Sequence, residues 1–311
     1  MITIIRTVSM VRTVLVLGLV AFTAAACSSG DGAASDAPHV VVTTNILGDV
    51  VENLVGEAAV VEVVMPPNAD PHDFAASAQQ AAAMREADAL VVNGLGFEEG
   101  LVDTIEAAAD DGVPVITATD AIDPIPFGDG DDPHLFTDPA RMRTAAALIA
   151  DQLGEAIPAL ATADGEARVS SYLDSLDALD QEVEDLLATV PAADRLLVTN
   201  HDVFGYFADR YDFEVVGAVI PGGSTLAEPS AAALADLVRE VDEREVPAVF
   251  AETSSPTRLA EALAGEGADV AVVELYSESL GEPGSPGGTY LGMVRTNAER
   301  IVAALAPQAV G

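Results

Sequence analysis

Short apolar runs alternate with stretches of helical periodicity along most of the chain. The strands predicted in the first half are residues 40–43, 60–64, 89–92 and 114–117, and the helices are residues 46–55, 78–87, 99–109 and 140–154. The strands predicted in the second half are residues 196–199, 214–219, 248–251 and 270–275, and the helices are residues 203–211, 230–243, 257–264 and 290–305. This alternation predicts an α/β fold with two lobes, each a four-stranded, mostly parallel sheet flanked by helices.

One long amphipathic helix is predicted between the two halves. Its apolar positions recur every three or four residues, with acidic residues between them: Val169, Leu173, Leu176, Leu179, Val183, Leu186 and Val190. We therefore divide the chain into an N-terminal lobe (39–164), a rigid linker helix (165–190) and a C-terminal lobe (191–311). A stiff connector of this kind favours limited motion between the lobes.

The first residues are typical of an exported lipoprotein. Arg6 and Arg12 precede and border an apolar run over residues 14–26, which is shorter than the roughly 20 residues that span a bilayer. The run ends in Ala24-Ala25-Ala26-Cys27, which resembles a bacterial lipobox with alanine where leucine is usual. We expect residues 1–26 to be a signal peptide and residues 27–38 a flexible tether. Lipidated Cys27 would then anchor the protein to the outer face of the cytoplasmic membrane. The alternative is an ordinary cleaved signal with an incidental cysteine.

The composition is strongly acidic. The formal net charge is −38, with 51 acidic and 13 basic residues and no lysine. Two of the basic residues and none of the acidic ones precede Cys27, so the chain after it carries −40. Such a chain repels nucleic acid, which excludes that class of partner. Coding bias or a saline habitat explains the acidity at least as well as metal binding, so the acidity alone does not indicate a metal site. Because Cys27 is the only cysteine, an internal disulfide is excluded and any metal site must use His, Asp and Glu.

Three of the four histidines share a setting. His72, His134 and His201 each lie in a polar loop that follows a predicted strand, and Glu278 follows the last strand. His39 lies beside the first strand, and we interpret it as incidental. Ligands of open α/β sheets collect beyond the carboxyl ends of the strands, so these loops are candidates to converge between the lobes. A single loop histidine is more often hydrogen-bonded than a ligand, so position alone leaves the ligand set open.

Several segments, in order, resemble the zinc/manganese substrate-binding proteins of ABC transporters, the cluster A-I family. They are Asp70-Pro71-His72, Asp132-Pro133-His134, Thr137-Asp138-Pro139, the segment 201–207, Glu228-Pro229-Ser230, Phe250-Ala251-Glu252, the segment 276–281 and the segment 289–293. The resemblance implies a monomeric extracytoplasmic receptor that holds one metal ion between two lobes and delivers it to the permease of an ABC importer. It also implies two ligands from each lobe: His72, His134, His201 and Glu278.

Glu278 departs from the family pattern, which usually has aspartate at this position, and Glu252 is the alternative fourth ligand. Asp202 and Glu228 are the expected partners of the remaining ring nitrogens. The stretch 121–132 lacks the histidines found in many zinc-binding relatives. We interpret its acidic residues, Asp123, Asp129, Asp131 and Asp132, as a solvated loop.

Zn²⁺ is the predicted ion, because three imidazoles and one carboxylate form a tetrahedral set that suits zinc. Mn²⁺ is the alternative, although it prefers more oxygen ligands and the manganese-type relatives tend to have glutamate at the position of His201. Proton competition predicts weaker binding below about pH 6.5.

No enzymatic activity is expected, since the chain has neither an H-E-x-x-H motif nor a G-x-S-x-G motif. A metal-binding surface adhesin is a further alternative function.

Overall fold

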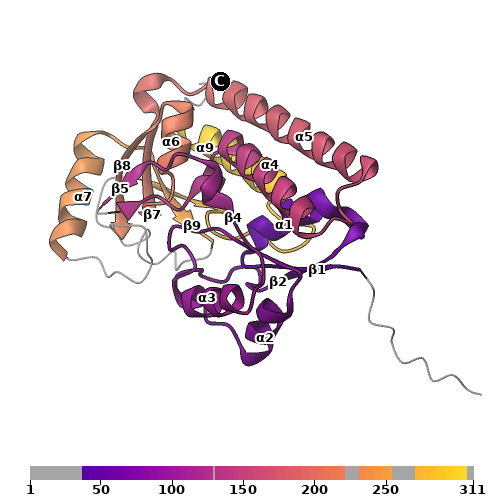
Figure 1. Cartoon of the computed structure of the whole chain (residues 1–311). Coiled ribbons are helices and arrows are strands. Elements are labelled where there is room, and N and C mark those ends of the chain that lie inside the picture. Colours follow the sequence, from indigo (N-terminus) through magenta and orange to yellow (C-terminus); the bar gives the residue numbers. More distant parts are fainter. Residues whose placement is uncertain (1–36, 129, 221–230, 254–269, 307–311) are drawn as a thin grey trace, which may run out of the picture. The chain divides into compact units, whose positions relative to one another are not determined.

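The structure is a computed structural model that describes residues 37–128, 130–220, 231–253 and 270–306. The predicted signal peptide, Cys27, most of the tether, Asp129, Glu228 and the predicted helix 257–264 lie outside these residues. The elements within the described ranges form two parallel four-stranded sheets, as the sequence predicts (Figure 1).

The N-terminal sheet has the strand order β2-β1-β3-β4. Its strands are β1 (His39–Val42), β2 (Val60–Val63), β3 (Ala89–Val92) and β4 (Val115–Thr117). Its helices are α1 (Asn45–Val55), α2 (Ala78–Glu86), α3 (Val102–Asp110) and α4 (Pro139–Ala156). Val40 and Val42 pack into the core with α1 and α4, while Val41 packs with α2 and α3. Burial on both faces explains why this strand is apolar throughout.

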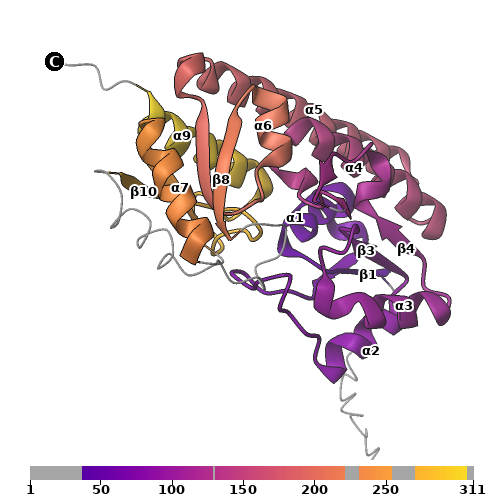
Figure 2. The same ribbon diagram turned by 90° about the vertical axis from the view of Figure 1, so that its left-hand side faces the viewer.

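The C-terminal sheet has the strand order β10-β9-β7-β8, again with parallel pairing. Its strands are β7 (Leu196–His201), β8 (Glu214–Ile220), β9 (Ala248–Glu252) and β10 (Ala271–Leu275). Its helices are α6 (Gly205–Tyr211), α7 (Ala231–Glu243) and α9 (Tyr290–Leu305). Figure 2 shows α7 beside β8. A short antiparallel ladder of β5 (Pro126–Phe127) and β6 (Gly130–Asp131) precedes His134.

The predicted linker is a single helix of 25 residues, α5 (Ala163–Leu187). Thr162 caps its first turn by accepting a hydrogen bond from the backbone N–H of Gly165. The helix runs alongside α4 and also packs against α1 and α9 (Figure 1). Its buried residues, among them Leu176 and Val183, join one core cluster that reaches both sheets. A shared core favours limited motion of the two lobes, although the predicted lobe boundaries themselves stay predictions.

No described helix is long and apolar enough to cross a membrane.

Candidate metal centre

Four side chains that are far apart in the sequence meet near the carboxyl ends of the strands of the two sheets. They are His72 after β2, His134 before a short 3₁₀ turn (Leu135–Thr137), His201 at the end of β7, and Glu278 after β10. Each offers one donor atom within 4.8 Å of the others, and all four side chains are buried. The structure therefore brings the four residues predicted as ligands into one cluster.

The three imidazoles point their Nε2 atoms at one carboxylate oxygen. Oε1 of Glu278 lies 2.8 Å from Nε2 of His72, 3.4 Å from that of His134 and 3.2 Å from that of His201. Nε2 of His134 and Nε2 of His201 have no hydrogen-bond partner among the described residues. Buried polar atoms are normally paired, so unpaired ring nitrogens that face one another indicate a ligand between them. Three nitrogens and one carboxylate form the donor set of a tetrahedral zinc site.

The other ring nitrogen of each histidine is bound to a carboxylate. Nδ1 of His134 lies 2.7 Å from Oδ1 of Asp132, and Nδ1 of His201 lies 2.7 Å from Oε2 of Glu252. Nδ1 of His72 lies 3.2 Å from Oε1 of Glu99. A carboxylate on Nδ1 fixes the ring orientation and leaves Nε2 as the metal donor.

These contacts correct three expectations. Asp132 is fully buried against His134 and is not part of a solvated loop. Glu252, the alternative fourth ligand, lies behind His201 on the side away from the four donors. Asp202, an expected partner of a ring nitrogen, is not among the three Nδ1 partners, which are Glu99, Asp132 and Glu252.

The cluster also shifts the acid–base behaviour of its members. Burial alone lowers the pKa of His134, but the neighbouring carboxylates of Asp132 and Glu278 outweigh burial and raise this pKa above its ordinary value. Burial likewise opposes a proton on His201, yet the charges of Glu278 and Glu252 hold its pKa well above the ordinary value. Burial raises the pKa of Glu278, but the neighbouring histidines reverse this and hold it well below its ordinary range. Without metal, the carboxylates therefore favour the protonated form of His134 and His201.

The loop that follows β3 forms one side of the candidate metal centre, and sequence reasoning missed its residues. The Phe97 ring packs edge-on against His72 and His134, with centroids 5.4 and 5.7 Å away. Oε1 of the buried Glu98 accepts hydrogen bonds from the Thr43 hydroxyl and the Asn93 backbone N–H, both at 2.6 Å. The Asn93 side chain donates to the backbone oxygen of Pro133 at 2.8 Å, beside His134. The only sequence signal for these residues is their position after a strand.

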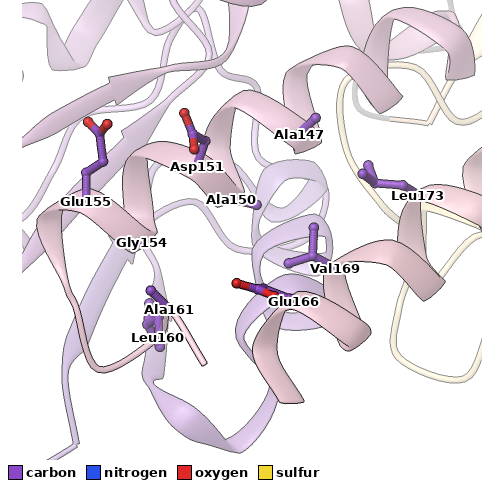
Figure 3. A pocket seen from close by; sticks show the side chains of 10 residues that line it. All are labelled: Ala147, Ala150, Asp151, Gly154, Glu155, Leu160, Ala161, Glu166, Val169 and Leu173. Carbon is purple, nitrogen blue, oxygen red and sulfur yellow. The ribbon is translucent and has the colours of Figure 1, made fainter. Parts of the chain in front are cut away.

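A cavity of about 470 Å³ lies elsewhere, between α4 and α5 (Figure 3). It is lined largely by small or apolar side chains such as Ala150 and Val169, with the carboxylates of Asp151, Glu155 and Glu166. No histidine is among the residues that line it. The candidate metal centre, by contrast, is a set of packed side chains.

The fold and the site define a two-lobed, helix-linked binding protein with a buried three-histidine, one-carboxylate centre. The chain belongs to the ZnuA family, described as zinc-uptake complex component A, periplasmic, which matches residues 40–304. This confirms the family resemblance seen in the sequence.

Two curated relatives illustrate the range of the family. The chain is 33% identical over 306 residues to the zinc-binding protein TroA of Treponema pallidum, covering 94% of this chain and 97% of TroA. It is 31% identical over 301 residues to the manganese-binding lipoprotein MntA of Halalkalibacterium halodurans, covering 93% and 97% of the two chains. A solved structure, described as the periplasmic zinc binding protein TroA from Treponema pallidum, matches with a TM-score of 0.82 and 32% identity, over 87% of this chain and 99% of that one. A zinc-bound ZnuA deletion mutant matches with a TM-score of 0.77 and 28% identity, over 88% and 100%.

Proposed function

We propose that this protein captures one divalent metal ion between its lobes and delivers it to the membrane permease of an ABC importer. The observation that carries the proposal is the convergence of three buried imidazole Nε2 atoms on one carboxylate oxygen, two of those nitrogens having no hydrogen bond within the described part of the chain. The ligands are His72, His134, His201 and Glu278. The protein is a receptor without enzymatic activity, because four protein donors close a tetrahedral shell and leave no open position for a substrate.

Zinc is the ion we propose. Imidazole nitrogen is a borderline donor that suits zinc, and zinc stands above manganese in the Irving–Williams order. The name of TroA, a zinc-binding relative, supports this choice. Manganese is the second candidate, because MntA and further relatives are named as manganese-binding lipoproteins.

We further propose that the protein works outside the cytoplasm as a monomer, anchored through lipid on Cys27. The short apolar run before Cys27 and the lipoprotein names of several relatives support this location. A thioether-linked diacylglycerol supplies two chains, which is enough for stable anchoring.

The test is a competitive titration of metal-free protein that lacks residues 1–27, with zinc and with manganese, against a chromophoric chelator. We expect one-to-one zinc binding of nanomolar or tighter affinity and manganese binding that is orders of magnitude weaker. Comparable manganese affinity would favour the manganese receptor, and no binding of either ion would reopen the adhesin alternative. Unchanged affinity in a His134→Ala, His201→Ala double variant would overturn the ligand assignment.

A further inference from the structure

The loop that carries Glu278 is fastened to the N-terminal lobe, although it follows a strand of the C-terminal lobe. The Ser279 hydroxyl oxygen accepts hydrogen bonds from the Asn45 side-chain amide at 2.8 Å and from the Asn68 backbone N–H at 2.7 Å. The Leu280 backbone N–H donates to Oδ1 of Asn45 at 2.8 Å. We call Asn45, Asn68, Ser279 and Leu280 the interlobe latch. It joins residues more than 200 positions apart in the sequence.

Asn45 is a rigid support for this latch. It is the first residue of α1, directly after Thr44, whose side chain caps the helix by accepting from the Leu47 N–H at 3.2 Å. An asparagine amide has an NH₂ donor group and an acceptor oxygen side by side, and Asn45 uses them on consecutive residues of the loop; its NH₂ group also donates to the backbone oxygen of Pro66 at 3.3 Å. Because α1 is buried along one face, the loop is held against an element that itself has little freedom.

The other side of the loop is tied to the C-terminal lobe. The Tyr276 backbone N–H donates to Oδ1 of Asn297 on α9 at 2.9 Å. Glu278 therefore lies between two fixed points of the loop. Tyr276, two residues before it, is bound to α9, and Ser279, directly after it, is bound to α1. These two anchors set where the Glu278 backbone lies relative to the three histidines.

We infer that Asn45 is a positioning residue for metal capture: through Ser279 and Leu280 it holds Glu278 where Oε1 meets the three imidazoles. The inference rests on the proposed metal-binding function and extends it to a residue outside the donor set. A glutamate side chain has several rotatable bonds, so the position of its carboxylate depends on a fixed backbone. Loss of the latch lets Glu278 move away from the imidazoles and weakens metal binding.

A double-mutant cycle separates positioning from general stabilisation. Zinc affinity is measured by chelator competition for the parent, for Asn45→Ala and for Ser279→Ala, each with Glu278 and with Glu278→Ala. Ser279→Ala removes only a hydroxyl and is the milder test if Asn45→Ala lowers the yield of folded protein. Asn53→Ala is the matched control, since Asn53 lies on the same helix and its side chain donates to the backbone oxygen of Asp49, away from the loop that carries Glu278.

With Glu278 present, we expect each latch variant to weaken zinc binding about tenfold, the effect of one or two neutral hydrogen bonds. In the Glu278→Ala background the same substitutions should change affinity less than about twofold, since the group they position is absent. The visible spectrum of bound Co²⁺ should change in the latch variants and stay unchanged in Asn53→Ala. Equal losses in both backgrounds would show general stabilisation and overturn the inference. A parent protein that binds no metal, or a Glu278→Ala variant that binds as tightly as the parent, would instead overturn the proposed site.

Discussion

At the scale of single residues, the site depends on carboxylates that do not touch the metal position. Asp132 and Glu252 are buried, and each binds the Nδ1 atom of one histidine. A buried carboxylate is costly unless it is paired, and here the histidine ring provides the partner. The same contact fixes the tautomer that turns Nε2 toward the other donors. The two acids therefore support ligand geometry and are themselves stabilised by it.

Glu252→Gln tests this support. Glutamine keeps the size and one acceptor atom but removes the negative charge behind His201. Loss of such a partner typically weakens metal binding about 10- to 100-fold, and we expect an effect near the lower end because an acceptor remains. The measurement is zinc affinity by chelator competition. Glu274→Gln, at an exposed position on the neighbouring strand β10, serves as the control and should bind like the parent. Parent-like affinity in Glu252→Gln would show that its charge is irrelevant to the site.

The raised pKa values of His134 and His201 predict how metal binding responds to pH. A histidine whose folded-state pKa is raised stabilises the metal-free fold below its ordinary value of about 6.5, and this contribution is lost as pH rises through the raised value. Metal binding requires neutral rings and has the opposite dependence. The increase in Tm on adding saturating zinc should therefore grow between about pH 6 and pH 8. Thermal unfolding with and without zinc measures it. An increase that does not vary with pH would contradict the proposed proton competition.

The sequence located the four donors better than the residues that support them. Asp132 was within reach of sequence reasoning, since it lies two positions before His134 and accepts from both the backbone and the ring of that residue. Position alone could not have decided it, because Asp70 stands in the same place before His72, whose Nδ1 binds Glu99. Glu252 needed the fold. The parallel pairing of Thr199 with Phe250 places His201 and Glu252, two residues further on, side by side.

At the scale of elements, the predicted strands agree with the observed ones to within two residues, because most of their residues are apolar, even in the more exposed edge strands β2 and β10. Helix starts were less well predicted. Residues 99–101 form a 3₁₀ turn before α3, and α6 begins at Gly205 where 203 was predicted. The ladder of β5 and β6 has two residues in each strand, which is too short for any periodicity to register.

The linker helix gives a prediction about stability. Leu179 on α5 is almost fully buried in the shared core. Leu179→Ala should therefore lower the free energy of unfolding by about 2–5 kcal/mol. Glu182, one turn further along α5, pairs with Arg295 of α9 through two hydrogen bonds of 2.7 Å, but both side chains are about 40% exposed. Glu182→Gln should cost at most about 1 kcal/mol. Urea unfolding of the metal-free variants compares them, and a larger loss for Glu182→Gln would show that the ion pair, more than the core, fixes the helix.

At the scale of the whole molecule, contacts cross between the lobes in both directions. The interlobe latch ties the Glu278 loop to α1, and the Tyr206 hydroxyl of α6 donates to the backbone oxygen of Asp132 at 2.7 Å. The N-terminal lobe thus holds the loop that bears the ligand Glu278. The C-terminal lobe holds the loop that bears Asp132, the partner of the ligand His134. Together with the core around α5, these ties favour small adjustments around the metal over wide opening of the lobes.

The net charge gives the prediction at this scale. With 51 acidic and 13 basic residues, most carboxylates have no cationic partner to pair with, and like charges repel across the folded surface. Salt shortens the screening length from about 30 Å at 0.01 M to about 3 Å at 1 M, so it removes this repulsion more than it weakens the few close ion pairs. The Tm of the metal-free protein should therefore rise as sodium chloride increases over this range, and the rate of zinc association should fall because long-range attraction of the cation is screened. Calorimetry and stopped-flow mixing measure the two effects, with an equal osmolality of sucrose as the control for non-ionic stabilisation. A Tm that falls with salt would contradict this prediction. It would show that the surface ion pairs stabilise the fold more than the repulsion between carboxylates destabilises it.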